Sequence, residues 1–163
     1  MNSFYKQFLI RDWQQKDRNF TVAVIRDVLQ EYSLPWQPEN ADRDVIEVEN
    51  AYLKRGGEFW VVQQENKIVG TAAYYPIDRG EKAVEIRKMY LLPNVRRLGL
   101  GQYLLQQLET KIATQGFTEV WIETASVLKG AIKLYEKNGY QPTTGVETDR
   151  CDLVYVKRLS VDN

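Results

Sequence analysis

The sequence contains no histidine and only one cysteine, Cys151, among its 163 residues. Catalysis by Ser-His-Asp or Cys-His groups is therefore excluded, as are an internal disulfide and a zinc site built from cysteines. We expect no bound metal. Any proton transfer has to use Glu, Asp, Tyr, Lys, Cys, water or the backbone.

Long apolar runs and a net charge are also missing. No run approaches the roughly 20 apolar residues of a membrane span, and the first stretch, MNSFYKQFLIRDW, lacks the apolar core of a secretory signal. Lysine plus arginine equals aspartate plus glutamate at 22 each, so nothing points to a nucleic acid or an anionic membrane as partner. We expect a cytoplasmic protein that binds neither.

Composition and hydrophobic pattern predict one domain of the α/β (α+β) class over residues 1–163. Hydrophobic residues make up 44% of the chain, and no change in composition marks a domain boundary. Apolar periodicity predicts helices at 18–32, 41–57, 101–116 and 127–139. Alternation and turn residues predict strands at 7–13, 58–64, 67–75, 83–92, 118–125 and 151–159. This order predicts a mixed, mostly antiparallel central sheet flanked by helices.

The strand at 83–92 alternates strictly, which predicts two faces. One face is expected to carry Ala83, Glu85, Arg87, Met89 and Leu91, and the other Val84, Ile86, Lys88, Tyr90 and Leu92.

The stretch NVRRLGLGQYLL places Gly99 and Gly101 at the start of a predicted helix. The first N–H groups of a helix have no partner within it, and its dipole is positive there, so a phosphate can bind. Glycines let the backbone approach the phosphate oxygens, and Arg96 and Arg97 add positive charge. The alternative is a structural turn with arginines in solvent. The spacing matches neither a P-loop nor G-x-G-x-x-G.

Two motifs carry a family resemblance. MYLLPNVRRLGLGQYLL resembles the coenzyme-A-binding signature of the GNAT superfamily of N-acetyltransferases, and AIKLYEKNGY resembles that family's A-x-x-L-Y-E-K-x-G-F segment. The resemblance covers about residues 57–159. It implies a GNAT-like fold and direct transfer of an acetyl group from acetyl-coenzyme A to a primary amine in a ternary complex. The helices within 17–55 are then expected to shape the acceptor site.

The resemblance also implies where the co-substrate acetyl-coenzyme A binds. The expected binding residues are Met89, Tyr90, Leu91, Arg96, Arg97, Leu98, Gly99, Leu100, Gly101 and Gln102. The first three match the strand that pairs with the pantetheine arm, and backbone amides of 98–102 would hold the pyrophosphate. Leu128 stands where many members carry a cofactor-contacting Asn, so that contact is expected to be absent or moved.

Two residues match catalytic positions of the family. Tyr135 matches a tyrosine near the thioester sulfur, where a phenol could give a proton to the departing thiolate. A core tyrosine is the alternative. Glu85 matches the general base of histone-type members, which a lysine-like amine with a pKa near 10.4 needs at neutral pH. The alternatives are an exposed glutamate paired with Arg87 or Lys82, and a water relay.

The acceptor is not identified; it could be a small-molecule or a protein amine. Carboxylates gather in one N-terminal region, with only Arg43 opposing: Glu31, Glu39, Asp42, Asp44, Glu47 and Glu49. They could steer a cationic amine, although ordinary solvent-facing carboxylates are the favoured interpretation. A non-catalytic acyl-coenzyme A-binding regulatory module is the alternative function. A homodimer through the final strand stays open.

Overall fold

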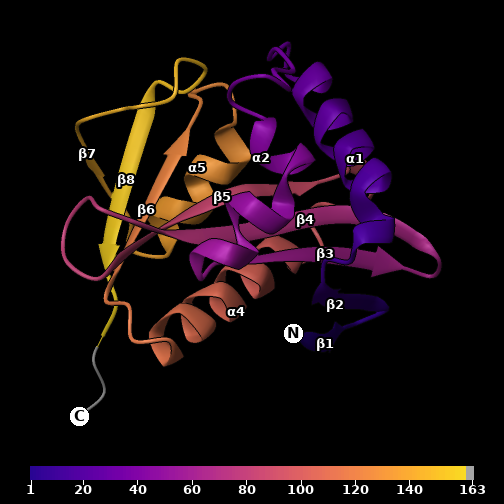
Figure 1. Cartoon of the computed structure of the whole chain (residues 1–163), viewed down its shortest axis with the longest axis horizontal. Coiled ribbons are helices and arrows are strands. Elements are labelled where there is room, and N and C mark those ends of the chain that lie inside the picture. Colours follow the sequence, from indigo (N-terminus) through magenta and orange to yellow (C-terminus); the bar gives the residue numbers. More distant parts are fainter. Residues whose placement is uncertain (161–163) are drawn as a thin grey trace.

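A computed structural model describes residues 1–160, which form one sheet with helices on both of its faces (Figure 1). The strands are β1 (Asn2–Tyr5), β2 (Phe8–Asp12), β3 (Glu58–Gln64), β4 (Lys67–Ile77), β5 (Ala83–Leu91), β6 (Glu119–Thr124), β7 (Gln141–Thr143) and β8 (Leu153–Arg158). The α-helices are α1 (Arg18–Glu31), α2 (Arg43–Ile46), α3 (Val48–Ala51), α4 (Leu100–Thr114) and α5 (Lys129–Lys137). Short 3₁₀ turns occupy Gln15–Asp17, Leu53–Arg55 and Pro93–Val95.

The eight strands lie in the order β1-β2-β3-β4-β5-β6-β8-β7. All neighbouring pairs are antiparallel except β5 and β6, which are parallel. A parallel pair needs a crossover connection, and α4 provides it between β5 and β6. The predicted mixed, mostly antiparallel sheet is confirmed.

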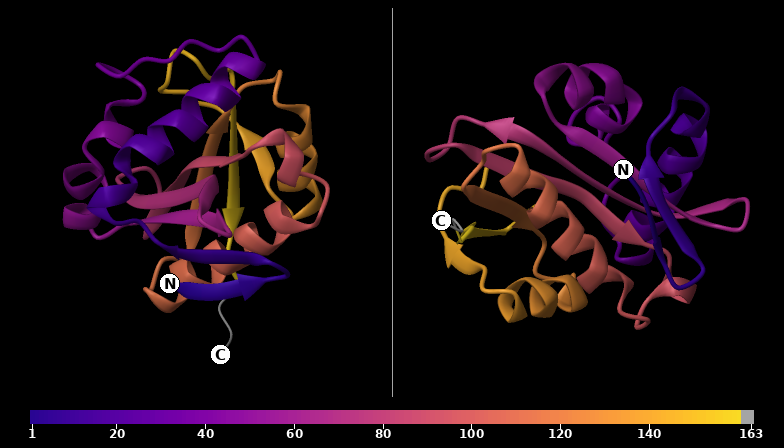
Figure 2. Two further views of the ribbon diagram at one scale, coloured as in Figure 1. Left: turned by 90° about the vertical axis from the view of Figure 1, so that its right-hand side faces the viewer. Right: turned by 90° about the horizontal axis from the view of Figure 1, so that it is seen from below.

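Helices cover the two faces of the sheet separately, as the view from below shows (Figure 2, right). On one face Ile25 and Leu29 of α1 pack with Phe59 and Val61 of β3, together with residues of α2 and α3. On the other face α4 contributes a stripe of buried leucines, and α5 contributes Tyr135. This divides the apolar core into two clusters, one on each side of the sheet.

One predicted helix was wrong, two strands were not predicted, and the final strand is not at the edge of the sheet. The helix expected at 41–57 is broken at Glu47, whose φ and ψ of −115° and 49° separate α2 from α3. Val45, Val48 and Tyr52 are all fully buried across that break. The short strands β1 and β7 were not predicted, because β1 is largely solvent-facing and β7 consists of three exposed residues. The final strand β8 is not a free edge, since β7 covers its residues 154–156.

A β-bulge interrupts β5 at Lys88. Lys88 and Met89 together face only Ala72 of β4, where a regular ladder would place one residue opposite one. Lys88 has a φ of 51°, a left-handed conformation that is uncommon for residues other than glycine. The Thr71 hydroxyl donates a hydrogen bond of 2.6 Å to the Lys88 carbonyl and holds the bulge in place.

The bulge reverses the alternation of side chains along β5. Ile86 packs in the cluster beneath α4 and α5, and Met89, which regular alternation would place on the opposite face, packs against the same cluster. Tyr90 packs against the cluster beneath α1. The predicted pair of faces was therefore wrong beyond Arg87. The extra residue of the bulge exchanges the faces on which the following side chains lie.

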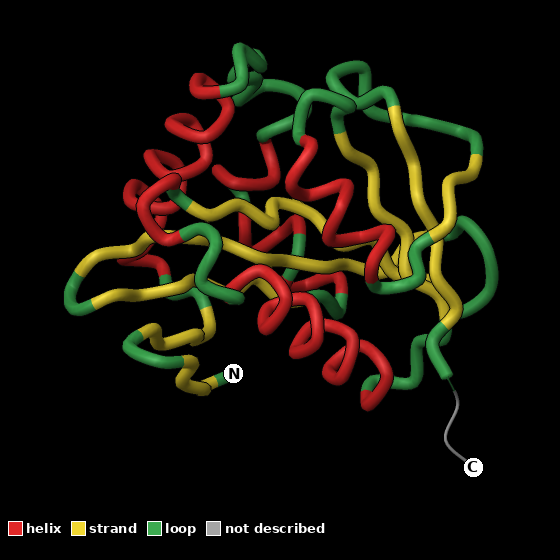
Figure 3. The backbone as a smooth tube through the Cα atoms, turned by 180° about the vertical axis from the view of Figure 1, so that it is seen from behind, coloured by secondary structure: helices red, strands yellow, loops and turns green. Residues whose placement is uncertain are grey.

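The parallel pairing of β5 and β6 ends early. It extends only to Ile86 and Ile122, after which the two strands diverge (Figure 3). The bulge at Lys88 lies two residues beyond the last paired residue, Ile86. β5 and β6 are therefore separated at this point, next to α5. Among residues 1–160, no helix has the length and apolar character needed to cross a membrane.

Candidate active site

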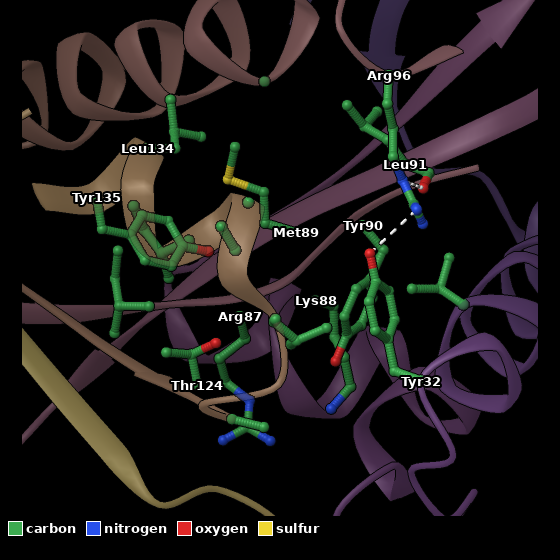
Figure 4. A pocket seen from close by; sticks show the side chains of 18 of the residues that line it. Tyr32, Arg87, Lys88, Met89, Tyr90, Leu91, Arg96, Thr124, Leu134 and Tyr135 are labelled. Atoms are coloured by element: carbon green, nitrogen blue, oxygen red, sulfur yellow. Dashed lines mark hydrogen bonds between the residues drawn. The ribbon is translucent and has the colours of Figure 1, made fainter. Parts of the chain in front are cut away.

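A cavity of about 530 Å³ lies where β5 and β6 separate. Its walls come from the end of α1 and the residues that follow it, β5 between Ile86 and Leu91, the turn before α4, the end of β6, one face of α5, and Arg150 and Cys151 before β8 (Figure 4). Residues from six parts of the chain thus meet in one space.

The glycine turn has the backbone conformation that its sequence requires. Arg97 and Gly99 both have positive φ, 62° and 84°. The Leu98 carbonyl accepts hydrogen bonds from the Tyr5 hydroxyl at 2.8 Å and the Lys6 ammonium at 3.1 Å, which fixes the turn from the β1–β2 hairpin. A Cβ at Gly99 would collide with the Tyr5 hydroxyl. Gly99 is therefore required by the conformation of the turn itself.

Gly101 has a different reason to be glycine. It lies in the first turn of α4 and lines the cavity. A Cβ there would lie 3.4 Å from Leu134 and 4.0 Å from Leu91, so the protein leaves room for one more carbon. Because Gly101 has no side chain, nothing at this position covers the unpaired N–H groups of the first helical turn, which can bind an anion in the cavity.

Arg96 lines the cavity but is also a structural link. Its guanidinium forms two bonds of 2.7 Å with Glu31, one of 3.1 Å with the Tyr32 hydroxyl and one of 2.9 Å with the Leu91 carbonyl (Figure 4). The end of α1 is thereby joined to the end of β5. The sequence analysis gave Arg96 only the role of added charge, because its partner Glu31 is 65 residues away.

The other predicted binding residues lie partly in the cavity wall. Met89, Tyr90 and Leu91 line it, as do Arg97 and Gln102. Leu98 and Leu100 do not. The Leu98 side chain is exposed and that of Leu100 is buried in the core, so these two residues can offer only their backbone.

Tyr135 belongs both to the core and to the cavity wall. Its ring packs edge-on against Tyr140 with centroids 5.9 Å apart. Its hydroxyl points into the cavity toward the side chain of Met89 (Figure 4). Burial raises the pKa of Tyr135, so the hydroxyl keeps its proton at neutral pH.

Glu85 is buried, with 4% of its surface exposed, and it does not line the cavity. Its carboxylate accepts a 2.9 Å bond from Arg87, so the predicted pairing with Arg87 is present while the predicted exposure was wrong. Burial raises the pKa of Glu85, and the opposing effect of Arg87 does not cancel that increase. Arg87 lines the cavity, whereas Glu85 reaches it only through its bond to Arg87.

The N-terminal carboxylates are not an acidic surface, and the expectation that only Arg43 opposes them was wrong. Asp42 is fully buried, forms two bonds with Arg150 of 2.5 and 2.8 Å, and lies 3.2 Å from the ammonium of Lys88. Asp44 lies 3.3 Å from Lys88 and 3.5 Å from Arg87. These cations are more than 40 residues away, so charge counting within the segment could not find them.

Cys151 and Glu123 are among the cavity residues that the sequence motifs did not predict. Cys151 lines the cavity near Tyr90 and Tyr135, and burial raises the pKa of its thiol to about 11, with Glu123 adding to the increase. The thiol is therefore protonated at neutral pH and a poor nucleophile. Glu123 accepts bonds from Arg79 at 3.0 Å and from two backbone N–H groups. No short motif surrounds either residue.

Comparison with known proteins identifies the family. The family model described as Acetyltransferase (GNAT) family matches residues 23–140. The chain belongs to this family. It is 33% identical over 129 residues to a protein of Escherichia coli K12 named uncharacterized N-acetyltransferase YjgM, with 77% of each chain covered. The chain is thus an N-acetyltransferase.

Two solved structures show how widely the fold is shared. A GNAT acetyltransferase from Staphylococcus aureus Mu50 superimposes with a TM-score of 0.86 at 20% identity, covering 94% of this chain and 99% of the other. PaiA N-acetyltransferase from Thermoplasma acidophilum, solved in complex with coenzyme A, gives 0.71 at 18% identity, covering 93% and 99%. Within residues 1–160 of this GNAT protein, no group of three or more acidic or sulfur side chains could hold a metal ion.

Proposed function

We propose that this GNAT N-acetyltransferase transfers the acetyl group of acetyl-coenzyme A directly to the primary amine of a small molecule or protein, in a ternary complex. The observation that carries the proposal is a single cavity that joins the glycine turn, the unpaired part of β5 and the hydroxyl of Tyr135. Coenzyme A binding by the Thermoplasma structural neighbour supports the same assignment here.

The chain's own groups fit an acyl-coenzyme A. The N–H groups of residues 98–102 hold the pyrophosphate, and the backbone of Met89, Tyr90 and Leu91 pairs with the amides of the pantetheine arm. The β4–β5 ladder resumes after the bulge at Tyr90 and Leu91, whereas the pairing of β5 with β6 extends only to Ile86. The bound co-substrate supplies a thioester carbonyl to the acceptor amine. Tyr135 then donates its proton to the leaving sulfur.

Glu85 is the proposed base. Its raised pKa makes it a better proton acceptor than an ordinary glutamate. Because Glu85 does not line the cavity, the proton of the acceptor ammonium reaches it through a relay, such as a water molecule, instead of by direct contact.

Gly101→Val tests the location of the co-substrate. Acetyl-coenzyme A should raise the melting temperature of the wild type by several degrees, because ligand binds only the folded state and about 1 kcal/mol shifts a protein of this size by about 2–4 °C. The valine side chain would occupy the space beside the first N–H groups of α4, so the shift should vanish. Differential scanning fluorimetry measures both.

Ala113→Val is the matched control, since it adds the same branched side chain to an exposed position of α4 away from the cavity. It should lose some stability but keep the full ligand shift. A folded Gly101→Val protein that keeps the wild-type shift would show that the glycine turn is not the binding site.

A further inference from the structure

Three cationic side chains line one end of the cavity. The carboxylates that form ion pairs with them lie outside the cavity wall. Arg87, Lys88 and Arg150 line the cavity, whereas their partners Asp42, Asp44 and Glu85 do not. A group entering the cavity therefore meets the cations first and the carboxylates only behind them. Coulomb interactions weaken with distance, so these three cations act on an entering group more strongly than the three carboxylates behind them, and the one carboxylate in the wall, Glu123, is paired with Arg79.

This end is distinct from the phosphate end of the cavity. Arg87 and Lys88 precede the residues of β5 that lead to the glycine turn, and they point away from Arg96 (Figure 4). At about 3.3 Å per residue, Lys88 lies roughly 10 Å along the strand from Leu91. The proposed pyrophosphate site at the glycine turn and the three cations are thus at different parts of the cavity.

Arg150 has hydrogen-bonding capacity left for a ligand. Its terminal nitrogens donate to both oxygens of Asp42 and to the Pro35 carbonyl at 2.8 Å. A guanidinium has five N–H groups, so two of them are not used by the contacts described among residues 1–160. Asp42 orients the guanidinium from behind, and the Arg150 side chain, 5% exposed, is held at the cavity wall.

Arg87 is held in a similar way. Its nitrogens donate to Glu85, to the Tyr75 hydroxyl at 3.0 Å and to the Ala41 carbonyl at 3.3 Å. Glu123 is the one carboxylate of the described residues that lines the cavity, and its oxygens are taken up by Arg79 and two N–H groups. No acidic group at this end is left over to bind the ammonium of a simple amine.

We propose that the acceptor carries a carboxylate next to its amine, as an amino acid does, and that Arg150 and Arg87 bind this carboxylate. The inference rests on the proposed function and adds the substrate class. Arginine suits the task because its planar guanidinium matches a carboxylate with two parallel hydrogen bonds. The positive surroundings also favour the neutral form of the neighbouring amine, which is the form that attacks the thioester.

The experiment measures turnover on matched acceptors, by thiol release with saturating acetyl-coenzyme A. Several L-amino acids with different side chains are each compared with their amide and with the amine that lacks the carboxylate. The best amino acid should exceed both of its analogues in kcat/KM by about tenfold to a hundredfold. Analogues that react as well as the amino acid would overturn the inference while leaving the proposed function standing.

Arg150→Gln locates the effect. It should remove most of the preference for the carboxylate while acetyl-coenzyme A still raises the melting temperature. Arg11→Gln is the matched control, because Arg11 makes the same two-bond pair with the buried Asp17, at 2.8 and 2.9 Å, outside the cavity. An unchanged preference in folded Arg150→Gln overturns the assignment to Arg150.

Two further outcomes have to be considered: an Arg150→Gln variant that does not fold, and a protein that binds acetyl-coenzyme A but acetylates no amine. If Arg150→Gln does not fold, Asp42→Asn combined with Arg150→Gln removes both buried charges, and the wild-type comparison of acceptors still decides the substrate class. If acetyl-coenzyme A binds but no amine reacts, the proposed function fails and this inference fails with it.

Discussion

Tyr135 illustrates how one side chain can meet a structural and a chemical requirement. Its ring fills the core between Tyr140 and Tyr155, which explains why the sequence alone allowed a core tyrosine. Its hydroxyl points into the cavity, where the proposed mechanism needs a proton for the departing sulfur. Substitution by phenylalanine separates the two roles, because it removes the oxygen and keeps the ring.

Tyr135→Phe should lower kcat by about tenfold to a thousandfold with little change in acetyl-coenzyme A affinity. Steady-state thiol release and the ligand-dependent melting shift measure the two quantities. Tyr140→Phe is the control, since Tyr140 bonds to Glu109 at 2.8 Å and does not line the cavity. If Tyr135→Phe turns over at the wild-type rate, its hydroxyl is not the proton donor.

Glu85→Gln tests the base. If Glu85 takes the amine proton, the rate of the wild type should rise with pH and then level off, and burial, which raises the pKa of Glu85, shifts this rise toward higher pH. The Gln variant should be most impaired near neutral pH and should recover toward about pH 10, where free amine becomes abundant.

The measurement for Glu85 is turnover against pH at saturating acetyl-coenzyme A, with one amine of known pKa. Glu119→Gln provides a matched control, because Glu119 is also buried but lies outside the cavity wall, bonded to Trp121. A loss that is the same at every pH would instead indicate that Glu85 mainly orients Arg87.

At the scale of elements, the glycine turn could be predicted and the bulge in β5 could not. The turn depends on local rules: glycines where φ is positive, a helix with unpaired N–H groups, and a proline that ends the strand. The bulge depends on how β4 pairs with β5, and it places Lys88, a residue with no preference for positive φ, in a left-handed conformation. Nothing in the residues 83–92 themselves signals that the alternation reverses.

The break between α2 and α3 was not predictable from the local pattern either. Apolar spacing in 41–57 fits one helix, and Val45, Val48 and Tyr52 are all buried, yet the backbone departs from helical geometry at Glu47. The type of element was predicted correctly where propensity and burial agree, as in α4. The prediction failed where the same buried face is made by two short helices instead of one.

At the scale of the whole molecule, Asp42 connects three segments that are far apart in sequence. Its oxygens accept the Gln37 N–H at 2.8 Å and the bonds from Arg150, and they lie close to Lys88. The loop before α2, the bulge of β5 and the loop before β8 are thereby held against one another. Two of these segments, the bulge of β5 and the loop before β8, contribute Lys88 and Arg150 to the cavity wall.

Asp42 should also make stability depend on pH. Burial by itself raises the pKa of Asp42, but the Arg150 bonds and the charge of Lys88 outweigh it and hold the pKa below its usual range. A lowered pKa stabilises the folded state at pH values above about 3.9, and this contribution is lost as the pH falls through the folded-state value. Urea unfolding of the wild type at several pH values between 7 and 3 should therefore show decreasing stability.

Asp42→Asn should lower the free energy of unfolding by about 3–5 kcal/mol at pH 7, because it leaves Arg150 and Lys88 buried with one anion fewer. It should also flatten the loss of stability toward pH 3, although Asp17, whose pKa is lowered too, keeps part of that slope. Asp27→Asn, at an exposed position of α1, is the control and should change neither the free energy of unfolding at pH 7 nor its decrease toward pH 3. A variant with wild-type stability and an unchanged acid limb would mean that the three segments are held together without Asp42.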